Sequence, residues 1–275
     1  MNIKKKRKVS VVDIILAVFL TILALIAILP FVLMVLFSLT NKKILDLSFD
    51  VSTFGLQNYI RIFTQMDIGR YFLNSAIIVV GACFLVCAFG SMAAYGFAKK
   101  KFPGRDKLFW VYLSTMMVPS QVTLIPVFVI MKKLGLVNTY WALMIPSVNA
   151  FGAFLIRQFI ISLPDDLFEA ARLDGCSEFK VFTSIVLPLI KPVLISLTVI
   201  TFRWSWNDYM WPLILTTTDK MQTLTLSVAT LAGKAITDQG LVMAGATLCF
   251  LPPFILYLIL QKQFTEGIAL SGIKG

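Results

Sequence analysis

Long apolar segments constrain the fold of this chain more than any other feature. The segments over about residues 11–39, 71–98 and 240–261 are long enough to cross a lipid bilayer, which takes roughly 20 apolar residues. Inside a bilayer the backbone has no water to bond, so a spanning segment is either a helix or part of a closed barrel. These segments are continuous and show no polar–apolar alternation, so they favour helices. We therefore expect an all-α polytopic membrane protein.

The composition supports a membrane protein and argues against several other classes. Of the 275 residues, 58% are hydrophobic and only 14% are charged, against about 25% charged residues in a soluble domain. The net charge of +11 would suggest nucleic acid in a soluble protein. Here we interpret the positive charges as signals of membrane topology and expect no nucleic-acid partner. The chain contains no His, which excludes His-based metal sites, proton relays and catalytic triads.

Six predicted spans form a single transmembrane domain over residues 1–275. A polar loop over residues 164–183 separates the fourth span from the fifth. The spans cover about residues 11–39, 71–98, 108–131, 140–163, 184–213 and 240–261. Because proline disturbs helices, we expect a break in the first span, two interruptions in the third and a defined entry into the fifth. The prolines concerned are Pro30, then Pro119 and Pro126, then Pro188 and Pro192.

The basic residues predict how the chain is oriented. The basic run Lys4–Lys8 before apolar residues resembles a signal peptide, but the following run is longer than the 7–15 residues of a signal-peptide core. We interpret it as a retained first span. With the N-terminus inside, the inner segments hold about twice as many Lys and Arg residues as the outer segments. Both termini and the loop over residues 164–183 are therefore predicted to be cytoplasmic.

The polar loop predicts a short helix. Asp165 is a favourable N-cap residue, and Gly175 suits a C-terminal turn that needs a positive φ. The helix would have about ten residues and a length of about 15 Å. Leu167, Phe168 and Ala171 would share one face. Glu169 and Arg172 would lie on the more polar side.

The same loop carries a recognisable motif. It reads Glu-Ala-Ala-Arg-Leu-Asp-Gly over residues 169–175, followed after nine residues by Ile-Val-Leu-Pro over residues 185–188. This motif resembles the cytoplasmic coupling loop of carbohydrate-type ABC importer permeases, in particular the maltose-type second permease subunit. The resemblance implies the type I ABC importer permease fold with six transmembrane helices and both termini in the cytoplasm. It assigns ATPase coupling to Glu169, Ala170, Ala171, Asp174, Gly175, Ile185, Leu187 and Pro188.

The resemblance extends over nearly the whole chain. Other matching segments are Asn74-Ser75, residues 206–212, and residues 264–267 and 272–275. In the family, the coupling helix docks into a cleft of the ATPase; by resemblance Glu169 would pair with the nucleotide-binding partner. The implied partners are a second homologous permease, an ATP-binding cassette ATPase dimer and an extracytoplasmic solute-binding protein. The implied function is import of a sugar, oligosaccharide or related polyol across the bacterial cytoplasmic membrane by alternating access.

The chain lacks a nucleotide site of its own. A P-loop requires Gly-x-x-x-x-Gly-Lys-Ser/Thr, whereas Gly233-Lys234 is preceded by Val228 at the first Gly position and followed by Ala235. We expect no cofactor on this chain, with ATP and Mg²⁺ used by the partner ATPase, and hence no enzyme activity here. We expect no metal site either, because the four cysteines lack metal-ligand spacing. They are Cys83, Cys87, Cys176 and Cys249.

Polar residues within predicted spans mark a candidate solute path, because such residues usually face a cavity or a partner helix. The candidates are Arg203, Trp204, Asn207 and Asp208, with Asn149 and, more weakly, Gln121. A structural or gating role and direct solute contact both remain open for them. Trp residues collect at membrane interfaces in any case, and Asp208 could simply balance the charge of Arg203. Arg203 also leaves room for an anionic solute.

Two alternative classes fit less well. A secondary transporter or channel acting alone would normally carry ionisable residues near the bilayer midplane. The interiors of the second, third and sixth spans contain no Asp, Glu, Lys, Arg or His. A membrane-embedded enzyme would need paired carboxylates, a metal cluster or a nucleophile–base pair inside the spans, and the sequence offers none.

Overall fold

The computed structural model describes residues 10–40, 53–235 and 238–271. Within these ranges the chain forms helices, with one isolated β-bridge between Thr40 and Phe54 and no strand. The all-α class expected from the apolar segments is therefore confirmed for the described residues.

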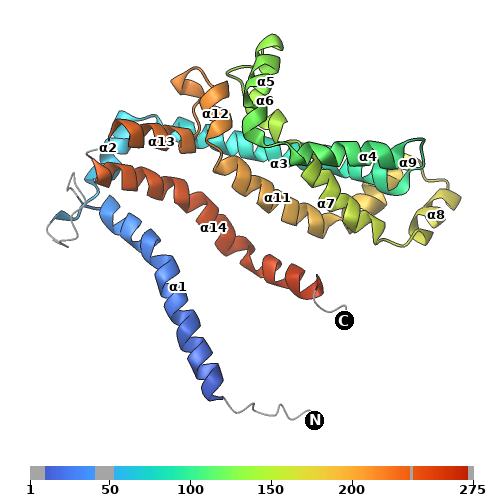
Figure 1. Ribbon diagram of the computed structural model, residues 1–275, viewed down its shortest axis with the longest axis horizontal. Coiled ribbons are helices and arrows are strands. Elements are labelled where there is room, and N and C mark those ends of the chain that lie inside the picture. Colours follow the sequence, from blue (N-terminus) through green and yellow to red (C-terminus); the bar gives the residue numbers. More distant parts are fainter. Residues whose placement is uncertain (1–9, 41–52, 236–237, 272–275) are drawn as a thin grey trace. The chain divides into compact units, whose positions relative to one another are not determined.

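The helices follow one another along the chain with short connections (Figure 1). They are α1 (Val11–Ser38), α2 (Gln57–Gln65), α3 (Ile68–Lys99), α4 (Arg105–Ser114), η2 (Thr115–Met117), α5 (Ser120–Lys133), α6 (Tyr140–Met144), η3 (Ile145–Ser147), α7 (Ala150–Ile161), α8 (Asp166–Leu173), α9 (Glu178–Val181), the π-helix η4 (Phe182–Val186), α10 (Leu187–Leu189), α11 (Lys191–Trp206), α12 (Met210–Leu215), η5 (Asp219–Met221), α13 (Leu224–Lys234) and α14 (Gln239–Ser271).

Three helices are long and apolar enough to cross a membrane without a break: α1, α3 and the segment Gln239–Ile259 of α14. Three further candidates are pairs of helices that meet at a bend. The pair from α4 to α5 bends by 104°, the pair from α6 to α7 by 44°, and the pair from α9–α10 to α11 by 73°. If each bent pair is one span, the described residues hold up to six, the number that the sequence predicts.

Proline has a smaller effect on these helices than expected. The helix α1 runs through Pro30, and α5 runs through Pro126, so the expected interruptions at these two residues are wrong. Transmembrane helices tolerate proline because lipid offers the remaining backbone groups no other partner. Pro119 does mark a break, because it lies at the N-cap of α5, at the 104° bend.

The predicted fifth span over residues 184–213 is not one helix. It begins in the π-helix η4, bends at Ile190, and ends as α11 at Trp206. Residues 207–209 then separate α11 from α12. The side chain of Asn207 donates a hydrogen bond of 2.9 Å to the carbonyl of Arg203, which satisfies a carbonyl at the end of α11.

The chain divides into two compact units. One contains residues 1–66 and 231–250, and the other contains residues 67–230 and 251–275. In the first unit, the amide of Asn58 donates to the carbonyls of Ser38 and Thr40 at 3.0 and 2.8 Å. Arg61 forms an ion pair of 2.7 Å with Asp238. The single domain over residues 1–275 remains a prediction.

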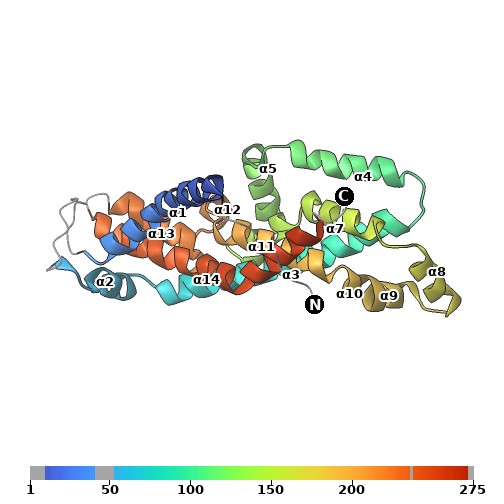
Figure 2. The same cartoon turned by 90° about the horizontal axis from the view of Figure 1, so that it is seen from below.

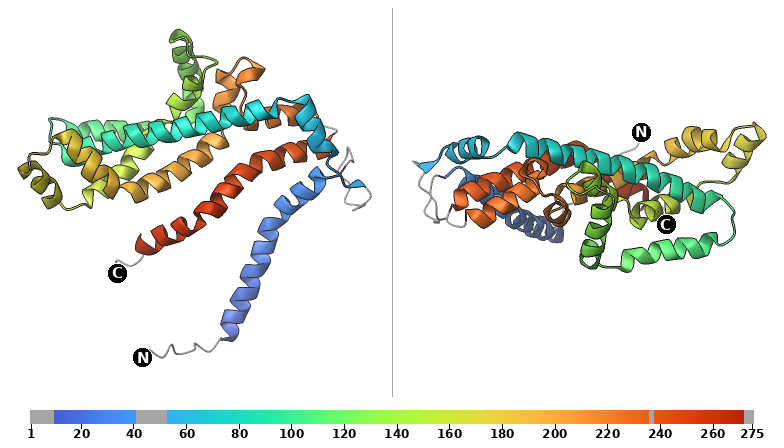
Figure 3. Two further views of the ribbon diagram at one scale, coloured as in Figure 1. Left: turned by 180° about the vertical axis from the view of Figure 1, so that it is seen from behind. Right: turned by 90° about the horizontal axis from the view of Figure 1, so that it is seen from above.

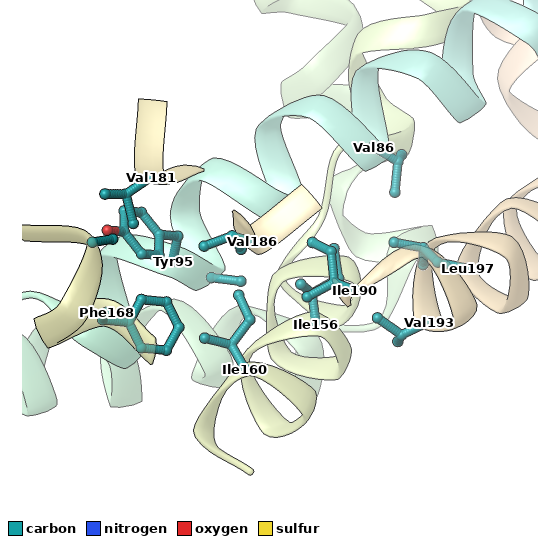
Figure 4. Close-up of a cluster of buried hydrophobic side chains, with 12 residues drawn as sticks. Val86, Tyr95, Ile156, Ile160, Phe168, Val181, Val186, Ile190, Val193 and Leu197 are labelled. Atoms are coloured by element: carbon teal, nitrogen blue, oxygen red, sulfur yellow. The ribbon is translucent and has the colours of Figure 1, made fainter. Parts of the chain in front are cut away.

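In the second unit, α3 packs along α7 and α11 (Figure 1). Glycine permits this close packing. A Cβ at Gly152 in α7 would lie 3.1 Å from Val86 Cγ1 of α3 and 3.3 Å from Leu197 Cδ2 of α11. Figure 4 shows Ile156 of the same helix close to these side chains in a buried apolar cluster. The three helices therefore form a tightly packed frame.

The first turns of α3 are bonded to a distant loop. The amide of Asn74 donates to the carbonyls of Lys220 and Gln222 at 2.9 and 2.8 Å, and its oxygen accepts from the hydroxyl of Tyr140 at 2.8 Å. Ser75 Oγ accepts from the backbone N–H of Leu224 at 2.9 Å. Asn74 and Ser75, singled out in the sequence, thus hold the segment before α13 against α3.

The contact at Gly152 generates a prediction. Gly152→Leu should lower the stability of the folded chain by about 1–3 kcal/mol, the usual cost of overpacking a tight interior. Thermal unfolding in detergent, followed by circular dichroism, measures the effect. The control is Gly96→Leu, because a Cβ at Gly96 meets nothing within 4 Å. Equal melting temperatures for the two variants would contradict close packing at Gly152.

Candidate functional site

The coupling loop, residues 164–183, extends from the end of the frame formed by α3, α7 and α11. In Figures 1 and 2 and in both panels of Figure 3, α8 lies beyond the C-terminal end of α3. The loop contains α8 and α9 and enters the π-helix η4. It thus presents a short helix outside the packed helices.

The N-cap of α8 lies at the predicted residue. Asp165 is the N-cap, and its carbonyl accepts from the N–H groups of Phe168 and Glu169 at 2.9 and 3.1 Å. Its side chain makes no capping bond, so that part of the expectation is wrong. The helix has 8 residues instead of about ten and is about 12 Å long.

The carboxylate of Asp165 bonds to Lys99 instead. Lys99 Nζ donates to Asp165 Oδ1 at 2.6 Å and to the carbonyl of Leu163 at 2.9 Å, and lies 4.6 Å from the ring centroid of Phe168. The hydrogen bond and charge of Lys99 hold the pKa of the Asp165 carboxyl below its usual value. Because the pKa is lowered, the contact is complete above the ordinary pKa of Asp and is lost as the pH falls through the lowered value. It is therefore formed at neutral pH.

The end of α8 matches the sequence prediction. Gly175 has a φ of +74°, a conformation that costs a residue with a Cβ more than it costs glycine. Its N–H donates to the carbonyl of Arg172 at 3.0 Å, and the N–H of Cys176 donates to that of Ala171 at 3.0 Å. This pair of bonds is a Schellman motif. Gly175 therefore turns the chain sharply back after α8, and Asp174 is its C-cap residue.

The motif residues of α8 divide between two faces. Phe168 and Ala171 are buried in the main apolar cluster of the second unit, where Phe168 lies beside Tyr95 (Figure 4). Glu169 and Ala170 are exposed. Leu167 was expected to share the buried face, but 43% of it is exposed. Ala171 therefore attaches the helix to this chain, and Ala170 leaves a small exposed surface.

The later motif residues lie apart from the exposed face of α8. Ile185 and Leu187 are partly buried and pack against the same apolar cluster. They flank the end of the π-helix η4, a form often found at functional sites. Pro188 is exposed in the first turn of α10, just before the 73° bend. These three residues shape the return of the chain to its packed helices.

The candidate solute-path residues meet only in part. Asn149 is the N-cap of α7, and its Oδ1 accepts from the N–H of Phe151 at 3.0 Å. The ring of Phe151 lies 5.3 Å from that of Trp204, centroid to centroid. The structure therefore places Trp204 beside Phe151, which lies two residues after Asn149 in the chain. Gln121 accepts a bond from the hydroxyl of its neighbour Ser120 at 3.4 Å.

Arg203 and Asp208 have different partners in this region. Arg203 and Asp208 are both described, and no ion pair joins them. Asp208 Oδ1 instead accepts from the N–H of Trp211 at 3.3 Å. The hydrogen bond of Asn207 goes to the carbonyl of Arg203, so the exposed guanidinium of Arg203 is not its partner.

Several residues of the site were missed in the sequence. Lys99 and Lys100 were read only as topology signals, and Tyr95 as part of an apolar span. No sequence pattern marked Glu178 as part of the site, apart from its position three residues after Gly175. Leu173 and Phe179 are 89% and 76% exposed. Both are apolar residues near Gly175 in an otherwise polar loop, and this pattern in the sequence could have identified them.

The described residues offer no metal site, since no group of three or more His, Cys, Asp or Glu residues is arranged to hold a metal ion. The carboxylates of the coupling loop bind basic side chains instead, as in the contacts of Asp165 with Lys99 and of Glu178 with Arg172.

The contact of Lys99 generates a prediction for the loop. Lys99→Met keeps the apolar stem but removes hydrogen bonds of about 1 kcal/mol each. Backbone amides of α8 should then exchange with deuterium at least roughly fivefold faster at neutral pH, as measured by mass spectrometry of peptides from residues 164–175. The control is Lys107→Met, which removes an exposed charge from the neighbouring basic turn. Unchanged exchange in Lys99→Met would show that the contact does not hold α8.

Comparisons with known proteins agree with this architecture. A family described as "Binding-protein-dependent transport system inner membrane component" matches residues 86–269, more than half of the chain. The arabinooligosaccharides transport system permease protein AraQ of Halalkalibacterium halodurans is 34% identical over 278 residues, covering 98% of this chain and 100% of the relative. The lactose transport system permease protein LacG of Rhizobium radiobacter is 34% identical, covering 93% and 94%.

Two further proteins are similar to this chain. The sn-glycerol-3-phosphate transport system permease protein UgpE of Pectobacterium atrosepticum is 34% identical and covers 73% of this chain and 72% of the relative. A chain of a bacterial ABC transporter involved in the import of the acidic polysaccharide alginate has the same fold. Its TM-score is 0.80 at 23% identity, with 95% of this chain and 99% of that chain covered. This chain therefore belongs to the family of inner membrane components of binding-protein-dependent transport systems, as a permease subunit of an ABC importer.

Proposed function

We propose that this chain imports a sugar, oligosaccharide or related polyol, together with a second homologous permease, an ATPase dimer and an extracytoplasmic solute-binding protein. The names of the relatives support this solute class, since they include permeases for arabinooligosaccharides and lactose. Both termini and the coupling loop lie in the cytoplasm in this proposal, in keeping with the excess of Lys and Arg in the inner segments.

The exposed surface of the coupling loop carries the proposal. Leu173 is 89% exposed and Phe179 is 76% exposed, on either side of the turn at Gly175. Leu167 adds a third apolar side chain in the same loop. Large apolar side chains near the centre of a patch are typical contacts of protein interfaces. We assign them to the ATPase partner, which would cover them in the assembled importer.

Glu169 and Ala170 complete this docking surface. Both side chains are exposed on α8. The small side chain of Ala170 allows a partner to approach the helix backbone closely. Glu169 offers a carboxylate to a basic residue of the ATPase, and such a pair favours one orientation of the two surfaces.

ATP and Mg²⁺ are bound by the ATPase and not by this chain. Closure of the ATPase dimer on ATP would move the docked α8 of each permease, and the permease pair would switch from inward-facing to outward-facing. Hydrolysis would reset it. The chain's own contribution is mechanical: it binds the ATPase through α8 and passes the displacement to its spans.

Solute contact is proposed for the region around Trp204, Arg203 and Asn149, with Asn207 and Asp208 shaping the end of α11. Aromatic faces bind the C–H side of sugars, and Trp204 is 45% exposed beside Phe151. The exposed guanidinium of Arg203 would suit an anionic solute. One relative is named for sn-glycerol-3-phosphate transport, which shows that anionic solutes occur in the family.

Docking is tested with Leu173→Asp. A carboxylate at the centre of an apolar contact should reduce recovery of the ATPase with the tagged permease at least tenfold, because losing such a contact typically costs about 2 kcal/mol or more. The measurement is purification of the tagged chain from its host in mild detergent, with mass spectrometry of the co-purified proteins.

Two variants make the docking test specific. Leu134→Asp places the same charge on another exposed leucine, in the turn after α5 and outside the coupling loop, and should keep the ATPase. Glu169→Lys should separate ATP hydrolysis from uptake, because it puts a positive charge where a negative one docks. Recovery of the ATPase with Leu173→Asp at the wild-type level, with normal uptake by Glu169→Lys, would overturn the docking claim.

The role of Arg203 is tested by comparing two solutes. Arg203→Ala should reduce uptake of sn-glycerol 3-phosphate at least tenfold more than uptake of lactose if the guanidinium binds the solute, since a charged hydrogen bond is worth about 1.5–3 kcal/mol. Uptake of the two radiolabelled probes by cells expressing the complete importer gives the ratio. An equal loss for both would assign Arg203 a structural role.

A further inference from the structure

We propose that Glu178 is the positioning residue that ties the docking end of the coupling loop to α3, so that a displacement of α8 reaches the membrane-spanning helices. The proposal rests on the docking of the ATPase at α8. It adds a residue outside the Glu-Ala-Ala motif and gives it a role within this chain.

One carboxylate joins three parts of the chain. Glu178 Oε2 accepts from the hydroxyl of Tyr95 at 2.8 Å and forms an ion pair with Lys100 Nζ. Glu178 Oε1 lies 3.6 Å from Arg172 Nε. Tyr95 belongs to α3, Lys100 is the C-cap of α3, Arg172 belongs to α8, and Glu178 begins α9. We call these four residues the Glu178 junction.

The local backbone places Glu178 at this position. After the turn at Gly175, Ser177 is the N-cap of α9, and its side chain accepts from the N–H of Lys180 at 3.4 Å. The first residue of α9 is therefore oriented by a capped helix start. The Schellman motif of α8 and the cap of α9 together bring Arg172 and Glu178 to the same side of the loop.

The partner on α3 is held rigidly. The ring of Tyr95 is buried, with centroids 6.4 Å from Phe168 of α8 and 5.6 Å from Phe182 of η4. Lys100 Nζ lies 5.3 Å from the centroid of the same ring. Figure 4 shows Tyr95 between Phe168 and Val181 within the apolar cluster. The hydroxyl therefore presents a fixed donor to Glu178.

The helix α8 is thus attached to the last turn of α3 at both of its ends. Lys99 binds Asp165 before the first turn of α8, and the Glu178 junction binds Arg172 in its last turn. The proposed docking residue Glu169 lies between these attachments. A force applied to α8 is then transmitted to α3, a continuous helix of 32 residues, instead of being absorbed by the loop.

The Glu178 junction contributes little to folding stability, so its role in transmission can be tested separately from folding. Glu178 is 52% exposed at its side chain, and Arg172 and Lys100 are 46% and 32% exposed. Exposed ion pairs contribute little to stability because water screens them and the side chains lose entropy. Changes at Glu178 should therefore leave the fold and the ATPase contact intact and affect transmission alone.

The test compares the assembled importer with and without ATP and vanadate. Hydrogen exchange is measured for peptides of the coupling loop and of the end of α3, residues 84–100. In the wild type, nucleotide trapping should change exchange in both segments. In Glu178→Ala, the change at the coupling loop should remain while the change at the end of α3 falls at least threefold.

Two further variants distinguish positioning from general damage. Tyr95→Phe keeps the ring packing but removes the donor to Glu178, and should show the same loss of response at α3 with an unchanged melting temperature. Asp106→Ala removes the carboxylate of another exposed ion pair, with Arg105 at 2.9 Å, and Asp106 is not part of the Glu178 junction. Arg105 is left in place because its Nη1 donates to the carbonyl of Lys100 at 3.3 Å. It should behave as the wild type.

Each other outcome overturns the proposal. A full response at the end of α3 in both Glu178→Ala and Tyr95→Phe would show that the junction does not transmit displacement. Loss of the ATPase from Glu178→Ala would make Glu178 a docking residue instead. Failure of the wild-type chain to recover an ATPase would overturn the proposed function, and the role of Glu178 with it, before any variant is compared.

Discussion

The absence of water inside a bilayer governs this structure. Each spanning segment must satisfy its own backbone, so the described chain is helical throughout its candidate spans, and α1 continues through Pro30. At some helix ends, side chains replace the missing backbone bonds. Asn149 caps the start of α7 after the 44° bend, and Asn207 bonds the end of α11. At the 104° and 73° bends, the residues that precede α5 and α11 are Pro119 and Ile190, and neither gives a side-chain cap.

The helix α3 forms long-range hydrogen bonds near both of its ends. Asn74 and Ser75 bind the segment before α13 near its start, and Lys99 and Tyr95 bind the coupling loop at its end. Between them the helix packs closely on apolar side chains, as at Gly152, and the thiols of Cys83 and Cys87 contact Thr198 of α11 at 3.5 and 3.4 Å. This arrangement suits a rigid element that carries displacement, because a packed helix moves as one body while its polar ends hold the loops.

The coupling loop was predictable in outline because its signals are local. A negatively charged start, a glycine with positive φ and a proline before the next helix act over a few residues, and the structure has α8 ending at Gly175 as expected. The faces of α8 were predicted less well. Helical periodicity predicted that Leu167 shares a face with Phe168 and Ala171. In the structure Phe168 and Ala171 are buried in the apolar cluster, whereas Leu167 is exposed. Helical spacing alone does not show which of two neighbouring apolar residues will be buried.

The sequence by itself determined that the chain is a helical membrane protein, how many spans it can form, and which loop carries the coupling motif. These properties follow from apolar length and short-range patterns. Only the tertiary structure decided which residues of that loop face outward and what holds them. The partners of Asp165 and Glu178 are Lys99 and Tyr95, 66 and 83 residues away in the chain. Such pairs form only when packing of α3 against α7 brings distant segments together.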